Sequence, residues 1–144
     1  MNILVSACLM GLPCRYDGKS KPNAKVLALG AKHTLIPVCP EQMGGLPTPR
    51  PPAEWQDGNI VNKDGVDVTE AYLRGADQAA YLATFSGCRC AILKERSPAC
   101  SHKEIYDGSF TGKLIPGWGS AAWAVASEGI LVLGESELDR LPEE

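Results

Sequence analysis

Ile3-Leu4-Val5-Ser6-Ala7-Cys8 is the stretch from which the fold can be worked outward. It is a run of apolar, β-favouring residues that ends just before Gly11 and Pro13, a pattern typical of a buried strand of a parallel sheet. No basic segment precedes the run and no cleavage site follows it. The N-terminal sequence therefore predicts a first strand rather than a signal peptide.

Strand and helix patterns alternate along the rest of the chain. Strands are predicted at residues 34–39, 89–94 and 130–134, and helices at residues 22–31, 70–85 and 120–128. Pro37 predicts that the second strand lies at a sheet edge. Asp64-Gly65 predicts a small hairpin over residues 59–68. The alternation predicts the α/β class, as a single-domain, three-layer, Rossmann-like or flavodoxin-like fold. We expect a mainly parallel sheet of about four strands plus this hairpin.

The predicted helix at 70–85 has the clearest signals. Thr69 is a plausible N-cap, and Gly87 follows its end. Small side chains form a stripe suited to close packing on a sheet. The members of the stripe are Tyr72, Ala76, Ala79, Ala80 and Ala83. Prolines and glycines predict irregular loops at residues 40–52 and 97–119.

The overall composition limits the class of protein. The 144 residues fit one domain, 1–144, and no apolar run has the roughly 20 residues of a membrane helix. The net charge of −3 and the pI of about 5.4 argue against binding to long nucleic acid. We therefore expect a cytoplasmic protein whose partner is a small molecule. The oligomeric state is not predicted.

Six cysteines without a C-x-x-C pair disfavour a zinc ribbon or a thioredoxin-type site. Cys8, Cys39 and Cys100 each lie at or shortly after the end of a predicted strand. Because the carboxyl ends of parallel strands meet at one edge, these three thiols are expected to converge there. Three thiolates suit zinc or an iron–sulfur cluster, and a zinc site would need Cys14 or His102 as a fourth ligand.

Ordinary burial is the alternative explanation for the cysteines, since free cysteine is often buried. We favour it for Cys88 and Cys90, whereas Cys14 stays open between spare ligand, reactive thiol and loop filler. Gly117-Trp118-Gly119-Ser120 opens a predicted helix whose N–H groups could meet an anion. Other loop residues expected near the same edge are Arg15, Lys103 and Lys113, with Tyr16, Tyr106 and Trp118 as possible stacking partners for a base.

Several motifs together make the sequence resemble the thiouracil desulfidase family. They run through nearly the whole chain in the family's order. The motifs are Ser6-Ala7-Cys8-Leu9-Met10-Gly11, Arg15-Tyr16-Asp17-Gly18, Val38-Cys39-Pro40-Glu41, Gly44-Gly45-Leu46, Pro49-Arg50-Pro51, Lys94, Ser97-Pro98-Ala99-Cys100, Tyr106-Asp107-Gly108 and Phe110-Thr111-Gly112-Lys113. The chain departs from the family pattern at Ser101-His102, where many members have glycine after the cysteine.

This resemblance implies a [4Fe-4S] cluster held by Cys8, Cys39 and Cys100, with one open iron for the substrate's sulfur. It also implies that Glu41 and Ser97 are the catalytic polar residues. The expected activity is non-redox release of hydrogen sulfide from a thiolated uracil or thiouridine nucleotide, leaving the uracil product. In this hypothesis Glu41 acts as a general base or proton shuttle and Ser97 orients or relays the proton.

Two other functions are compatible with the residues. One is a metal-free enzyme in which Cys8 or Cys14 attacks the thiocarbonyl carbon as a nucleophile. The other is a non-enzymatic module that binds zinc or a nucleotide. The absorbance spectrum of anaerobically prepared protein and its release of sulfide separate these possibilities.

Overall fold

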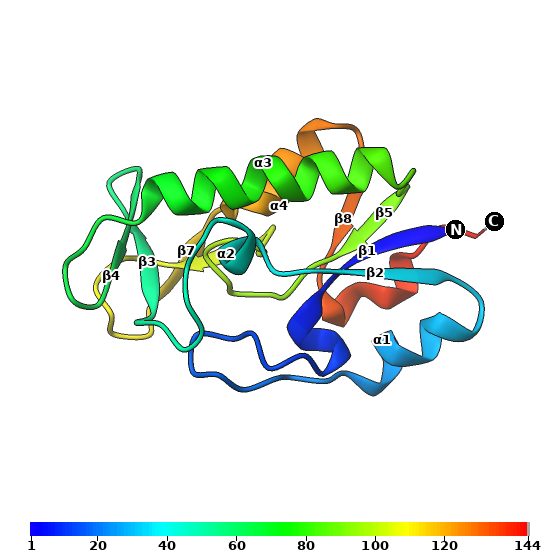
Figure 1. The fold of residues 1–144 in the computed structure, drawn as a ribbon, viewed down its shortest axis with the longest axis horizontal. Helices are drawn as coiled ribbons and strands as arrows, with labels where there is room; N and C mark the ends of the chain where they lie inside the picture. Colours follow the sequence, from blue (N-terminus) through cyan, green and yellow to red (C-terminus); the bar gives the residue numbers. More distant parts are fainter. Residues whose placement is uncertain (144) are drawn as a thin grey trace.

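The computed structural model describes residues 1–143 and contains a four-stranded parallel sheet. The strand order is β2-β1-β5-β8, which confirms the α/β prediction (Figure 1). The strands are β1 (Asn2–Ser6), β2 (Thr34–Val38), β5 (Cys90–Ile92) and β8 (Leu131–Leu133). As Pro37 predicted, β2 lies at the edge, where a residue without an N–H costs no ladder hydrogen bond.

Alternate residues of each strand point to opposite sides of the sheet, so apolar side chains project from both faces. Both faces are covered. Leu4 and Ala91 belong to a core shared with α3 and α4, whereas Ile3, Val5 and Ile92 belong to a second core on the other face. That second face is covered by α1 and by the C-terminal 3-10 segment η3 (Figure 1). The covering elements are α1 (Ala24–Ala28), α3 (Thr69–Phe85), α4 (Ser120–Ser127) and η3 (Glu135–Arg140).

The long helix α3 follows its predicted pattern closely. All five residues of the small-residue stripe are buried, and Gly87 follows the helix with a φ of 65°. Thr69 is the first helical residue rather than the N-cap, which is Val68. The Asp67 side chain, two positions before the predicted N-cap, accepts from the backbone N–H of Thr69 and so satisfies one of the free N–H groups of the first turn.

The hairpin prediction was placed one turn too late. The observed hairpin pairs β3 (Ala53–Gln56) with β4 (Asn59–Asn62) around Asp57-Gly58. Asp57 and Gly58 both have positive φ, as the two-residue turns of hairpins require. Asp64-Gly65 does turn the chain. In residues 1–143, the β-pairing across this turn is a single antiparallel bridge between Val61 and Asp67 rather than a pair of strands.

The two predicted irregular loops were partly wrong. Residues 40–52 begin with the short helix α2 (Pro40–Met43), where Pro40 occupies a first-turn position that needs no N–H donor. Residues 97–119 contain a second hairpin of β6 (Glu104–Tyr106) and β7 (Leu114–Pro116). Strands of three residues are too short to show an alternating pattern. None of the helices in residues 1–143 is both long and apolar enough to cross a membrane.

Two glycines allow α2 to approach α3 closely. A Cβ atom at Gly75 in α3 would lie 1.9 Å from the carbonyl oxygen of Pro40, and one at Gly44 would lie 1.9 Å from that of Ala71. Both distances are far below any real Cβ contact. The absence of two side chains therefore fixes where α2 lies, and with it the positions of Cys39 and Glu41.

We predict that Gly75→Ala lowers the free energy of unfolding by about 2 kcal/mol, because overpacking outweighs the gain in helix propensity. Urea unfolding followed by circular dichroism measures the change. Gly30→Ala is the matched control, since the nearest atom to a Cβ there is 3.7 Å away, and its stability should stay near that of the unmodified chain. A Gly75→Ala protein of unchanged stability would contradict the proposed contact.

Candidate active site

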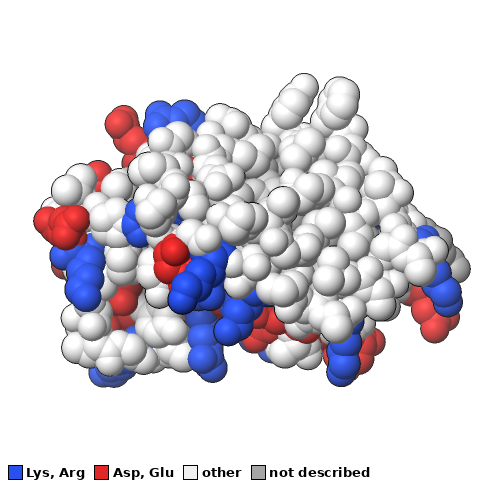
Figure 2. Space-filling model, turned by 60° about the horizontal axis from the view of Figure 1, so that its bottom comes forward, with Lys and Arg blue, Asp and Glu red and all other residues white. Residues whose placement is uncertain are grey.

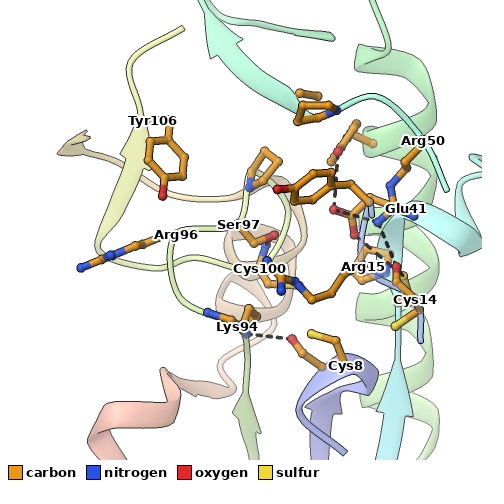
Figure 3. Close-up of a pocket in the computed structure, with 18 of the residues that line it drawn as sticks. Cys8, Cys14, Arg15, Glu41, Arg50, Lys94, Arg96, Ser97, Cys100 and Tyr106 are labelled. Carbon is orange, nitrogen blue, oxygen red and sulfur yellow. Dashed lines mark hydrogen bonds and ion pairs between the residues drawn. The ribbon is translucent and has the colours of Figure 1, made fainter. Parts of the chain in front are cut away.

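A cavity of about 650 Å³ lies beyond the carboxyl ends of β1, β2 and β5 (Figure 3). The chain passes from β1 to β2 on one side and returns to β5 on the other, so the strand order reverses at β1. Open α/β sheets bind ligands at such a reversal. Residues after all three strands line the cavity, and the β3–β4 and β6–β7 hairpins contribute its outer walls.

The three cysteines predicted to converge all line this cavity. Cys8 lies in the 3-10 turn η1 (Ala7–Met10) after β1, Cys39 directly follows β2, and Cys100 lies in the loop after β5. Cys8 and Cys100 are buried, whereas Cys39 is half-buried. The sheet therefore delivers three thiols from distant parts of the sequence to one cavity, while their function as ligands stays a prediction.

Cys14 is a fourth thiol on the same cavity wall, and it is buried. Its side chain contacts the thiols of Cys39 and Cys8. Contact with Cys39 lowers the pKa of Cys14, but contact with Cys8 and burial outweigh this effect and raise that pKa to about 11. The remaining cysteines, Cys88 and Cys90, are buried in or beside the sheet away from the cavity.

The cavity favours the neutral form of the Cys39 and Cys100 thiols, as it does for Cys14. Contact with the Cys14 thiol, and then burial, raise the pKa of Cys39. Burial and the negative charge of Glu41 raise the pKa of Cys100, although hydrogen bonds from Ser6 and Ser97 oppose the shift. Because cysteine binds metals as the thiolate, metal binding here would release protons.

Glu41 is held inside the cavity by two partners whose contact with it the sequence did not indicate. It lies in α2 with 8% of its surface exposed. The Tyr72 hydroxyl donates to its Oε2 at 3.4 Å, and an Arg50 guanidinium nitrogen lies 3.8 Å from the same oxygen. Burial raises the pKa of Glu41, and the Arg50 charge opposes that rise. Two sequence features could have indicated these partners. Tyr72 is the bulky member of the small-residue stripe, and Arg50 lies between two prolines.

Ser97 orders the turn that carries Cys100. Its hydroxyl oxygen accepts from the backbone N–H of Ala99 at 3.1 Å and of Cys100 at 3.0 Å. The N-terminus of α4 then holds this turn from outside. Its N–H groups donate to the carbonyls of Pro98 and Ala99. The predicted anion site at Gly117–Ser120 is therefore wrong, because its donors are already used by the protein.

Aromatic and basic side chains form the rest of the cavity wall. The aromatic residues are Tyr16, Tyr72, Tyr106 and Phe110. The basic residues are Arg15, Lys21, Arg50, Lys63, Lys94 and Arg96, and the acidic ones are Glu41, Glu54 and Glu95. Figure 2 shows both signs of charge mixed over one part of a face, beside a largely uncharged area. The other predicted contacts, Lys103, Lys113 and Trp118, lie outside this wall.

His102 also lies outside the cavity wall, so it does not join the thiols as a fourth ligand. Its Nε2 lies 2.8 Å from Oε1 of Glu137. In residues 1–143, no three His, Cys, Asp or Glu side chains are grouped closely enough to hold a single metal ion. A cluster of several irons occupies the space between its cysteines, so it needs thiols that surround a cavity rather than meet at a point.

The β3–β4 hairpin orders the outer wall. Oε1 of the buried Glu54 accepts from the backbone N–H of Gly108 at 3.0 Å and of Phe110 at 3.1 Å. The Gln56 side chain donates to the Gly108 carbonyl, and the Trp55 indole donates to the Pro98 carbonyl at 3.0 Å. The hairpin thus connects the loop after β6 with the turn that carries Ser97.

Comparisons with known proteins agree over almost the full chain. The family model described as 2-thiouracil desulfurase matches residues 3–137. The uncharacterized protein YbbK of Bacillus subtilis (strain 168) is 40% identical over 147 residues, which covers 95% of this chain and 97% of YbbK. The solved structure of the [4Fe-4S]-dependent thiouracil desulfidase TudS is 46% identical with a TM-score of 0.91. That match covers 97% of this chain and 94% of TudS.

We predict that Glu54→Ala lowers the free energy of unfolding by about 2 kcal/mol, because a buried N–H group and a partly buried one lose their carboxylate acceptor. Hydrogen exchange at Gly108 and Phe110 should accelerate. The control is Glu104→Ala, which removes an exposed carboxylate from another hairpin strand. Unchanged exchange at those two amides in Glu54→Ala would show that the carboxylate does not hold the loop.

Proposed function

Because the chain belongs to the 2-thiouracil desulfurase family, we propose that it is a [4Fe-4S]-dependent, non-redox desulfidase. Its substrate is a thiolated uracil base or a thiouridine nucleotide. Water replaces the sulfur, so thiouracil and water give uracil and hydrogen sulfide without net oxidation or reduction. The observation that carries this proposal is the convergence of the thiols of Cys8, Cys39 and Cys100 on one cavity that also contains Glu41 and Ser97.

Cys8, Cys39 and Cys100 are the residues that would hold the cluster. Their donor chemistry fits it, because iron–sulfur clusters are held by cysteine thiolates. The bound cluster supplies a soft, Lewis-acidic iron without a protein ligand, which favours binding of the substrate's sulfur and polarises its C=S bond. The Ser6 hydroxyl contacts the Cys100 thiol and would support it as a thiolate.

The proton chemistry is assigned to Glu41. Its carboxylate lies beside Cys39, with 4.0 Å between the sulfur and Oε1, so it can take a proton from an attacking water or carry one to the ring nitrogen. Arg50 and Tyr72 hold its Oε2, which leaves Oε1 facing Cys39. Ser97 orders the Cys100 turn and places a hydroxyl on the cavity wall for proton relay.

The cavity wall fits a pyrimidine with or without a phosphate. Tyr16, Tyr106 and Phe110 offer aromatic faces for stacking. Arg15 and Arg96 both line the cavity (Figure 3), and a guanidinium cation can pair with a phosphate. All six cysteines are free thiols, a state that suits the reducing cytoplasm in which we place the enzyme.

The central experiment reconstitutes the protein anaerobically and incubates it with 2- and 4-thiouracil and with the corresponding thiouridine monophosphates. We expect broad absorbance near 400 nm, about four irons per chain, and sulfide release. Cys8→Ala, Cys39→Ala and Cys100→Ala should each lose the absorbance and the activity. Cys88→Ala is the matched control and should retain both, because Cys88 is a buried thiol outside the cavity.

Other outcomes of this experiment point elsewhere. Sulfide release by colourless, iron-free protein would replace the proposal with a cysteine nucleophile, and one bound zinc without sulfide release would indicate a non-enzymatic module. Loss of the cluster in Cys14→Ala as well would mean that four cysteines bind it, and this would refute an open iron.

We also predict that Glu41→Ala keeps the absorbance of the cluster while turnover falls at least about 100-fold, the usual contribution of a positioned proton-transfer group. Sulfide release under anaerobic conditions measures turnover, and iron content verifies loading. Glu128→Ala, an exposed carboxylate at the far end of α4, serves as the control. Full activity in Glu41→Ala would remove this residue from the mechanism.

A further inference from the structure

The loop that carries Ser97 and Cys100 is bound at both ends by the C-terminal segment η3. We name residues 94–103 the site loop. Its middle is held by the N-terminus of α4, as described above. Its two ends instead contact carboxylates of η3, which lies on the opposite face of the sheet from α4.

At the first end of the site loop, Glu135 makes two contacts. Its Oε2 lies 2.8 Å from the Lys94 ammonium, and its Oε1 accepts from the backbone N–H of Glu95 at 2.8 Å. The Glu95 carboxylate in turn accepts from the backbone N–H of Ser136 at 2.7 Å. Lys94 and Glu135 are largely buried side chains, which limits competition from water.

At the other end, Glu137 contacts two consecutive residues of the loop. Its Oε1 lies 2.8 Å from His102 Nε2, and its Oε2 lies 3.0 Å from the Lys103 ammonium. Glu137 is 6% exposed. Burial would raise the pKa of Glu137, but the backbone N–H of Gly134 and the nearby cations, Lys103 among them, lower it to about 2. The carboxylate therefore stays charged at neutral pH.

We propose that Glu135 and Glu137 are positioning residues that fasten the two ends of the site loop, and so fix Cys100 and Ser97 at the cavity. The effect of these contacts on a cluster rests on the proposed cluster chemistry. The contacts themselves are present in the protein without a cluster. A bound metal centre requires each ligand to keep its position, and groups that orient the ligands contribute strongly to metal retention. Neither carboxylate lines the cavity.

The test compares the double variant Glu135→Gln/Glu137→Gln with two controls in the full-length chain. Glu128→Gln makes the same kind of substitution at an exposed site. Arg140→Gln removes a Glu137 ion pair that lies within η3 and does not reach the site loop. Hydrogen exchange is measured on the protein without a cluster, and transfer of iron to a ferrous chelator is measured on the reconstituted protein.

In the double variant we expect exchange of the site-loop amides to rise about ten-fold, because these amides open locally without global unfolding. The amides of β1 and β5 should exchange as in the unmodified chain. Iron should transfer to the chelator several-fold faster, and kcat should fall with little change in KM. Both controls should match the unmodified protein in every measurement.

Three results would overturn the proposal: unchanged exchange in the site loop, equal acceleration throughout the sheet, or an unchanged rate of iron transfer. The first two are read from protein without a cluster. They are therefore independent of the proposed activity, which fails separately if the unmodified chain takes up no iron.

Discussion

The parallel pairing of β1 with β2 and with β5 is the constraint on which the site depends. The register places Ser6 beside Val38 and Val5 beside Ile92, so the three strands end at one edge. Each strand then turns differently, into η1, into α2, and into the site loop. One thiol follows each of these ends. The sheet thus brings together three cysteines that lie far apart along the chain, which no local sequence pattern could do.

Electrostatics then give the cavity its chemical character. Its inner part gathers groups that become anionic when they ionise. Burial raises the pKa of Glu41 and Cys100, and contact with Cys14 followed by burial raises that of Cys39. Arg50 and Tyr72 contact Glu41 from the wall behind it. Such an interior favours a cationic centre as occupant, because bound metal ions are large local charges that favour deprotonated ligands.

Local patterns predicted the parts of the fold that are locally encoded. The run at residues 3–8, the stripe of α3 and the strand-end cysteines all depend on periodicity or on the end of an apolar run. The missed features depend on contacts between distant residues. Glu54 binds Gly108, Glu135 binds Lys94, and the donors of α4 bind the turn before Cys100. The identity of a glutamate does not show whether its carboxylate is exposed to solvent or buried as a hydrogen-bond acceptor, so only the fold distinguishes the two cases.

The three proposed ligands are held by three separate devices. Two backbone N–H groups, from Gly11 and Lys21, donate to the Cys8 carbonyl. The glycine contact between α2 and α3 fixes the residue after Cys39. A Cβ atom at Gly119 would lie 2.4 Å from the carbonyl carbon of Ala99, so α4 packs directly against the Cys100 turn. Because folding already orders these three backbones, binding of a cluster would need to order only side chains, and this favours tight retention at a cavity that must also stay open to substrate.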